Sequence, residues 1–148
     1  MPDTALASLG ALAEALRPVL LRLSRNLRRD AQRFGLSPLD VHLLVSLVKA
    51  PGAGVSELAE REQISKAAMS AHVKRLEEAG WLVRDEDGQE DRRRVGLAAT
   101  PAGIAALEEV RRSRTDWLAA RLAELPAKDR AALEAALPAL AALAGEAG

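Results

Sequence analysis

The order of local signals across residues 55–100 constrains the fold of this sequence more than any other feature. Two short amphipathic segments, each beginning at a serine, are followed by a glycine, a short apolar stretch, a polar loop ending in three arginines, and a second apolar stretch. Serine caps the start of a helix, and glycine commonly follows its end. This order therefore predicts two helices joined by a tight turn and followed by a β-hairpin, in a mainly α-helical protein.

The first helix of this pair is expected at residues 57–62, with Ser56 as its N-cap. Leu58 and Ala59 are expected to face inward, and Ala59 is small enough to let a second helix cross close by. The segment Gly54-Val55, just before this helix, is expected to pair at the edge of a small sheet.

Gln63 and Ile64 form the turn into the second helix, which is expected at residues 66–79. Ser65 is its N-cap, and Gly80 is the glycine that ends it. Its apolar residues recur at steps of four and three, which places them on one buried face. These residues are Met69, Val73 and Leu76. The opposite face carries Lys66, Ala67, Ser70, Ala71, His72 and Lys74.

An exposed helix face of this composition fits the major groove of DNA. Its small side chains would let the helix backbone come close to the bases. Ser70 and His72 supply hydrogen bonds for a base edge or a phosphate, while Lys66 and Lys74 supply positive charge for phosphates. The second helix is therefore the candidate recognition helix.

The polar loop between the expected strands, residues 81–84 and 95–99, is the second candidate DNA contact. It ends in Asp91-Arg92-Arg93-Arg94, in which the aspartate can hold one guanidinium in a fixed orientation. An arginine held in this way suits a narrow minor groove, where the negative potential is enhanced. The acidic residues that precede this motif are expected to face away from phosphates.

Long helices are expected on both sides of this region. The first, at residues 4–33, has an apolar stripe and contains Pro18, which should kink or divide it. Ser37 and Asp40 form a capping box at the start of the next helix. Thr100 begins a helix that runs to about residue 124, and the last helix contains Pro138, which should kink it.

Composition limits the class of protein. The 148 residues suit one domain, the formal net charge is +0, and basic and acidic side chains also cancel across residues 61–94. Affinity for DNA must therefore come from where the charges lie. The absence of cysteine excludes disulfides and thiol redox sensing and fits a reducing cytosol. No apolar run long enough for a bilayer and no secretory signal are found, so we expect a cytoplasmic protein without membrane association.

Other chemistry is poorly supported. Ser46 and Lys49 match an S-x-x-K pattern, but the companion motifs are absent and the segment fits an amphipathic helix. His42 and His72 lie on separate expected helices with no carboxylate at metal-ligand spacing. Residues 85–88 begin like a calcium loop, but the glycine comes too early. We therefore expect no enzyme activity, no cofactor and no metal ion.

The order of these elements resembles the MarR family of bacterial winged helix-turn-helix regulators over essentially the whole chain. The matching residues are Val55-Ser56-Glu57-Leu58-Ala59, Ile64-Ser65-Lys66, Leu76-Glu77-Glu78-Ala79-Gly80, Asp91-Arg92-Arg93, Leu97 and Thr100. The Asp-Arg-Arg motif followed by a strand and a threonine is the most specific of them.

The resemblance implies a winged helix-turn-helix at residues 37–100 and a dimerisation region formed by the helices of residues 1–36 and 101–148. Together these make one MarR-like domain across residues 1–148. Two recognition helices of such a homodimer would read a palindromic operator in double-stranded DNA, usually to repress nearby genes. Many relatives release DNA when a small aromatic or phenolic anion binds between the dimerisation and DNA-binding regions.

The resemblance also assigns roles to residues of this chain. Asp91 and Arg93 match the wing pair, with Arg93 as the minor-groove arginine, and Ser70 falls where the family usually has Ser or Thr. The departures are Ala71, where relatives often carry arginine, and Gln63 in place of a turn glycine. The turn therefore either adopts a left-handed backbone at a cost of roughly 1 kcal/mol or takes another geometry. The residues expected to contact DNA are Ser65, Lys66, Ala67, Ser70, Ala71, His72, Lys74, Arg75, Asp91, Arg92, Arg93 and Arg94.

The effector pocket is expected among the first two helices and the helix that follows Thr100, with His42 as a polar handle and Trp117 as an aromatic wall. A packed core tryptophan and a half-exposed histidine would explain the same two residues. Two alternatives to an effector-controlled repressor stay open. One is a DNA-binding dimer without an effector, and the other is a helical dimer that acts only through protein partners.

Overall fold

The computed structural model of the chain describes residues 2–85 and 96–145. Within these residues, helices and an antiparallel β-hairpin follow one another as the sequence predicts. The elements are α1 (Pro2–Gln32), α2 (Pro38–Lys49), α3 (Val55–Glu62), α4 (Lys66–Glu78), β1 (Leu82–Asp85), β2 (Gly96–Ala99), α5 (Pro101–Ala123) and α6 (Ala127–Ala144). The predicted fold class, mainly α with a small hairpin, is confirmed.

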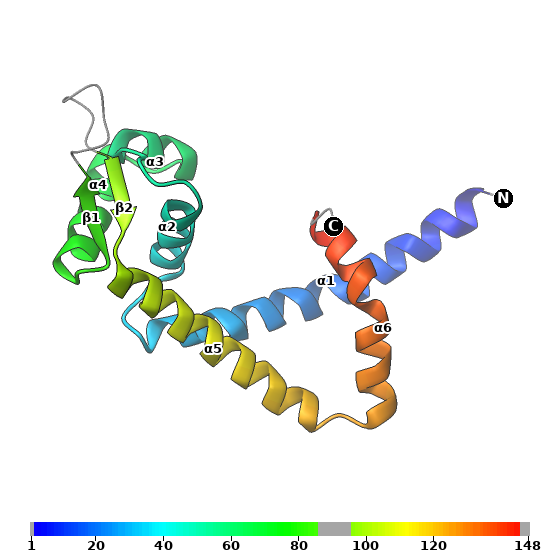
Figure 1. Cartoon of the computed structure of the whole chain (residues 1–148). Helices are drawn as coiled ribbons and strands as arrows, with labels where there is room; N and C mark the ends of the chain where they lie inside the picture. Colours follow the sequence, from blue (N-terminus) through cyan, green and yellow to red (C-terminus); the bar gives the residue numbers. More distant parts are fainter. Residues whose placement is uncertain (1, 86–95, 146–148) are drawn as a thin grey trace.

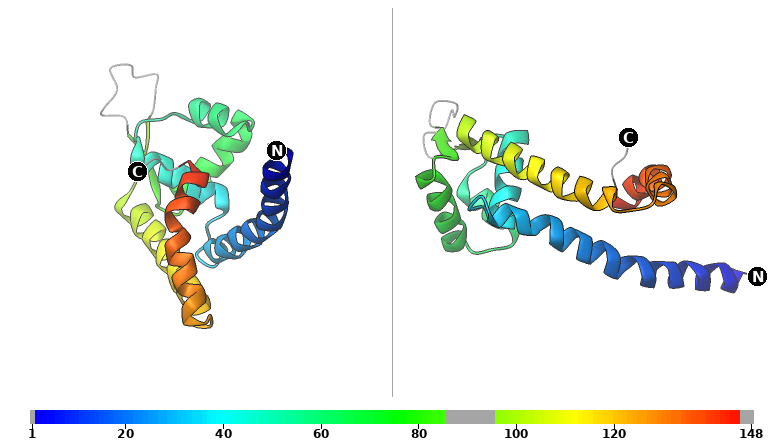
Figure 2. Two further views of the ribbon diagram at one scale, coloured as in Figure 1. Left: turned by 90° about the vertical axis from the view of Figure 1, so that its right-hand side faces the viewer. Right: turned by 90° about the horizontal axis from the view of Figure 1, so that it is seen from below.

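The elements form two regions (Figures 1 and 2). One end of the molecule holds α2, α3, α4 and the hairpin, while α1 and α5 extend from it side by side as long helices. Beyond the end of α5 the chain turns sharply into α6 (Figure 1). No helix among the described residues combines the length and apolar character needed to cross a bilayer.

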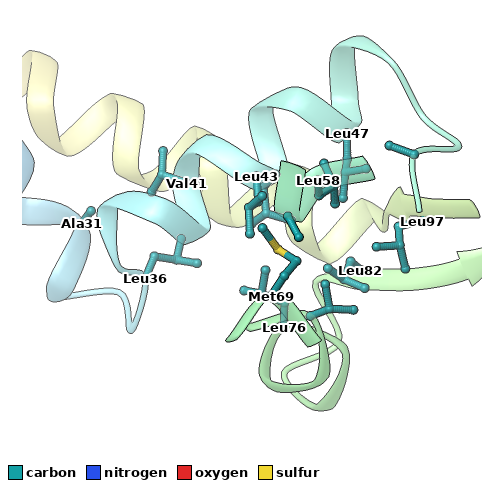
Figure 3. Packing of buried hydrophobic residues seen from close by; sticks show 14 of the residues in the cluster. Ala31, Leu36, Val41, Leu43, Leu47, Leu58, Met69, Leu76, Leu82 and Leu97 are labelled. Carbon is teal, nitrogen blue, oxygen red and sulfur yellow. The ribbon is translucent and has the colours of Figure 1, made fainter. Parts of the chain in front are cut away.

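The hydrophobic core lies in the first of these regions. Figure 3 shows Met69 and Leu76 of α4 pointing toward Leu43 of α2 and Leu58 of α3, with Leu82 and Leu97 of the hairpin alongside. All of these side chains are buried. Because α4 is anchored on this core along one face, the direction of its opposite face is fixed.

The long helices leave many apolar side chains exposed in the single chain. In α1 they are Leu9, Leu12, Val19, Leu20, Leu21 and Leu23. In α6 they are Leu133, Leu137 and Leu143, and this helix contains no buried residue. Large exposed apolar surfaces mark interaction sites in soluble proteins.

The predicted helix caps at Ser37, Ser65 and Thr100 are confirmed. The Ser37 backbone N–H donates to Asp40 Oδ2 over 2.7 Å, and the Asp40 N–H donates to Ser37 Oγ over 3.1 Å, which completes the capping box. Ser65 Oγ accepts from the N–H of Ala68, and Thr100 Oγ1 accepts from the N–H of Gly103. Each side chain therefore satisfies a backbone donor that the first turn of a helix leaves unpaired.

The predicted start of α3 is wrong. The helix begins at Val55, its N-cap is Gly54 in an extended conformation, and no side chain caps it, so Ser56 lies within the first turn. The predicted pairing of Gly54-Val55 with the sheet is displaced for the same reason. The N–H of Gly52 donates to the carbonyl of Leu97, and the N–H of Leu97 donates to the carbonyl of Ala53. Residues already in a helix cannot form these sheet bonds.

Pro18 and Pro138 lie inside helices, and Gln63 has a left-handed backbone conformation. Of the two outcomes predicted for Pro18, a kink or a division of the helix, division does not occur, because α1 continues through it. Helix α6 likewise continues through Pro138. Gln63 has φ 56° and ψ 39°, so the turn between α3 and α4 takes the left-handed geometry that the sequence left open.

Candidate nucleic-acid interface

Helix α4 has two sharply different faces. Met69, Val73 and Leu76 are all 0% exposed, as their spacing predicts. The residues predicted on the opposite face are exposed, namely Lys66, Ala67, Ser70, Ala71 and Lys74. Ser65, which caps the helix, is exposed beside them. Alanine and serine project little beyond the helix backbone, so this surface can approach a partner closely.

The charged residues of this exposed face are Lys66 and Lys74. Neither forms an ion pair with another described residue, so both ammonium groups are available to an anion. The exposed face therefore combines small side chains with two lysines that have no ion-pair partner among the described residues. This combination suits a surface that carries regularly spaced phosphates.

Arg75 and His72 lie on the flank of α4 that faces the start of α2. Arg75 Nη2 donates to Asp40 Oδ1, and His72 Nδ1 lies 3.4 Å from the same oxygen. Asp40 is 0% exposed, although the Arg75 side chain is 46% exposed. These two predicted contact residues are thus engaged within the protein, whereas the side chains of Lys66, Ser70 and Lys74 have no such partner among the described residues. The sequence showed Asp40 only as a capping residue, because its second partner is distant in the chain.

Burial would raise the pKa of the Asp40 carboxyl group. The hydrogen bond from Arg75, the two hydrogen bonds with Ser37 and the positive charge of Arg75 together outweigh burial and hold that pKa below its ordinary value. Asp40 is therefore ionised at neutral pH and forms a buried ion pair with a partly exposed arginine.

The hairpin next to α4 is the candidate wing. Leu82 pairs with Ala99 and Arg84 with Leu97 in antiparallel register. Arg84 Nε donates to Glu77 Oε2 over 3.2 Å, which ties β1 to the last turn of α4. The predicted contacts at Asp91, Arg92, Arg93 and Arg94 lie outside the described residues.

Trp81 connects α4, the hairpin and α5. Its backbone N–H donates to the carbonyl of Leu76 over 3.0 Å, and its carbonyl accepts from the N–H of Thr100 over 3.0 Å. Thr100 Oγ1 also donates to the carbonyl of Gly80 over 2.6 Å. Gly103 approaches so closely that a Cβ atom placed on it would lie 2.1 Å from the Trp81 oxygen. The orientation of α4 is therefore coupled directly to the start of α5.

The two predicted pocket residues are not brought together. Trp117 lines a hollow of about 380 Å³ between the end of α1 and α5. The other residues of this hollow are Arg33, Phe34, Glu109, Arg112, Ser113 and Asp116. His42 lies elsewhere, with its Nε2 atom 2.9 Å from Glu62 Oε1 and its side chain 61% exposed.

Sequence reasoning missed a second hollow, of about 430 Å³, along α1 beside the first turn of α2. Its lining residues are Leu21, Ser24, Arg25, Arg28, Arg29, Gln32 and Pro38. The spacing of the three arginines along one side of the first helix was the available signal. Among the described residues, no group of three or more histidine, aspartate or glutamate side chains could hold a metal ion.

Comparison with known proteins places this geometry in a family. The sequence model of the MarR family matches residues 34–94. The HTH-type transcriptional repressor MdtR of Bacillus subtilis is 31% identical over 118 residues, which cover 80% of this chain and 71% of that protein. The chain belongs to the MarR family. This MarR protein is thus an HTH-type transcriptional regulator with a DNA-binding region, and the relative's name supports the expectation that it is not an enzyme.

Solved structures share the fold of this MarR protein. The YusO protein of Bacillus subtilis is 27% identical, with a TM-score of 0.69 over 94% of this chain and 96% of that chain. A point mutant of MepR from S. aureus, bound to an oligodeoxyribonucleotide, is 16% identical, with a TM-score of 0.69 over 88% of this chain and 96% of that chain. The winged helix-turn-helix arrangement is therefore common to these proteins.

Proposed function

We propose that this MarR protein is a homodimeric repressor that binds a palindromic operator in double-stranded DNA, in the cytoplasm, and is released by a small-molecule effector. The observation that carries the proposal is the division of α4 into a buried apolar face and an exposed face of small and basic residues. A helix anchored in this way can enter the major groove without losing its own packing. The oligonucleotide bound to MepR supports the same use of the fold.

The proposed contacts divide into two sets. Ser70 reaches base edges while Ala67 and Ala71 let the backbone come close, and Lys66 and Lys74 bind phosphates on either side. The wing residues Asp91, Arg92, Arg93 and Arg94 supply the second set, with Arg93 in the minor groove. Since most of the α4 face is small, DNA shape and the wing carry much of the specificity.

The DNA-binding proposal is tested by a binding titration with DNA from beside the gene of this protein. We expect tight binding that weakens steeply between ~50 and ~200 mM salt, because phosphate contacts release counterions. Absent or salt-insensitive binding would instead favour a helical dimer that acts through protein partners. Arg93→Ala should weaken operator binding by about 1–3 kcal/mol. Its melting temperature should match that of the parent protein.

Dimerisation is proposed from the apolar surface that α1 and α6 leave exposed. Leu137, at 60% exposed, lies in the middle of α6, and burying such a side chain stabilises an interface by about 1.5–3 kcal/mol. Leu137→Glu should therefore shift the protein toward monomer in analytical ultracentrifugation, while Lys128→Glu on the same helix should not. An unchanged sedimentation coefficient for Leu137→Glu would remove α6 from the interface.

The effector is proposed to be a small aromatic or phenolic anion. The hollow along α1 supports this charge preference, because Arg25, Arg28 and Arg29 line it, and Trp117 lines the neighbouring hollow. Salicylate is a suitable probe because it combines a phenol with a carboxylate. We expect salicylate to weaken DNA binding and to change the tryptophan fluorescence. A protein that shows neither response to a panel of such anions would be a DNA-binding dimer without this class of effector.

A further inference from the structure

The buried carboxylate of Asp40 is the feature of the α4 flank that the proposed DNA contacts do not use. Asp40 is the one buried charged residue among the described side chains. One of its oxygens accepts from the backbone of Ser37 at the start of α2, and the other accepts from Arg75 on α4. It therefore links the capping box of α2 to the candidate recognition helix, 35 residues along the chain.

This link determines how the charge of Arg75 is used. A buried carboxylate is costly without a cation beside it, so the guanidinium of Arg75 is held where it compensates Asp40. His72 Nδ1 lies 3.4 Å from both Arg75 Nη2 and Asp40 Oδ1, so its ring lies against the ion pair. The ion pair adds no net charge to the surface of α4.

The neighbouring lysine behaves differently. Lys74 is adjacent to Arg75 in sequence and exposed, and it has no ion-pair partner among the described residues. With Arg75 held, the cations that α4 offers to phosphates are Lys66 and Lys74. An arginine freed beside Lys74 would add a long, flexible cation that can meet phosphates of any sequence, which strengthens non-specific binding.

We propose that Asp40 is a specificity-determining positioning residue, which keeps Arg75 against the flank of α4 and so prevents it from binding phosphates indiscriminately. The proposal rests on the proposed function, because it takes α4 as the helix that enters the groove. Asp40 itself touches no DNA and acts through Arg75.

The test compares Asp40→Asn with the parent protein in the full-length chain. Asparagine keeps the size of the side chain and an acceptor for the Ser37 N–H, but it removes the charge that holds Arg75. Binding to DNA from beside the gene and to a scrambled duplex is measured across a range of salt concentrations. We expect the salt slope to steepen by about 0.9, the value for one added phosphate contact. The ratio of operator affinity to scrambled-DNA affinity should fall several-fold.

A purely structural role for Asp40 would weaken binding to both duplexes and leave the salt slope unchanged, and that result would overturn the proposal. The matched double variant Asp40→Asn with Arg75→Gln removes both charges and keeps a hydrogen-bonding pair. Its salt slope should equal that of the parent, whereas Lys74→Ala should lower the slope by about 0.9. A double variant with a slope about 0.9 lower would show that Arg75 binds a phosphate in the parent, which also overturns the proposal.

The double variant keeps the proposal testable if Asp40→Asn alone does not fold. The parent titration separates this proposal from the proposed function. A parent that binds neither duplex in a salt-dependent way overturns the proposed function and this inference with it. A parent that binds normally, with an unchanged Asp40→Asn slope, overturns only the role of Asp40.

Discussion

Replacing Gly103 with alanine should destabilise the protein, although alanine is the better helix former. A Cβ atom at this position would lie 2.1 Å from the Trp81 carbonyl oxygen and 3.0 Å from its carbonyl carbon. An ordinary carbon–oxygen contact is about 3.3 Å or longer, so the start of α5 would have to move away from Trp81. The added Cβ atom is bonded directly to the backbone of α5, and the atoms it meets belong to the backbone of Trp81. No flexible side chain can therefore give way.

The magnitude follows from three contributions. Overpacking a tight contact costs about 1–3 kcal/mol. The movement also weakens the bond from the Thr100 N–H to the Trp81 oxygen, which is 3.0 Å long in the parent and contributes about 0.5–1.5 kcal/mol. Helix propensity offsets at most about 1 kcal/mol of this cost. We therefore expect a net loss of roughly 1–3 kcal/mol, which lowers Tm by about 3–10 °C for a chain of this size.

The assay is thermal unfolding followed by far-UV circular dichroism, at one protein concentration for all variants, since Tm of an oligomer depends on concentration. Ala102→Gly is the matched control, because Ala102 is exposed in the same turn and reports helix propensity alone. It should lose no more than about 1 kcal/mol. If Gly103→Ala melts at or above the temperature of the parent, the close approach of α5 to Trp81 does not exist in solution.

The remaining predictions concern a turn, a buried acid and a cap. Gln63→Gly should raise the free energy of unfolding by about 0.5–1 kcal/mol, because glycine relieves the left-handed strain at φ 56°; urea unfolding measures this, and a loss of stability would contradict it. Folding lowers the pKa of Asp40, so its ionisation stabilises the protein above the unfolded value of about 3.9, and this stabilisation is lost as the pH falls below that value. Asp40→Asn should consequently show a flatter loss of Tm during acidification than the parent or the surface variant Asp129→Asn, and parallel curves would refute this. Thr100→Ala should cost about 1–2 kcal/mol, because the side chain both caps α5 and donates to Gly80, while Thr100→Ser should restore most of the loss; equal melting temperatures for the two variants would exclude the hydroxyl as the cause.

The parts of the fold that local interactions determine could be predicted from the sequence. Ser65 and Thr100 each bond to a backbone N–H three residues later, and Met69 and Val73 share a helix face by spacing alone. The start of α3 was missed because Ser56 is a good cap by residue type. The sheet bonds of the preceding segment, which act over a longer range, place the N-cap at Gly54 instead.

The tertiary contacts of the candidate interface were beyond sequence reasoning. Arg75 was predicted as a DNA contact, and its ion pair with Asp40 could not be predicted by spacing because Asp40 comes from α2. His42 was placed in a pocket with Trp117, yet it pairs with Glu62 of α3 instead. The exposed residues of α4 were predicted because their environment depends only on which face is buried.

The close packing of Gly103 on Trp81 also makes α5 a lever arm for α4, the candidate recognition helix. At 23 residues, α5 is about 35 Å long, so a tilt of about 5° at its start corresponds to a displacement of about 3 Å at its far end. A displacement imposed near α6 would reach α4 as a small rotation, because backbone contacts join α5 to Trp81 and Trp81 to the end of α4. In a dimer bound to DNA as proposed, the spacing of two such helices would then be adjusted from the opposite end of the molecule.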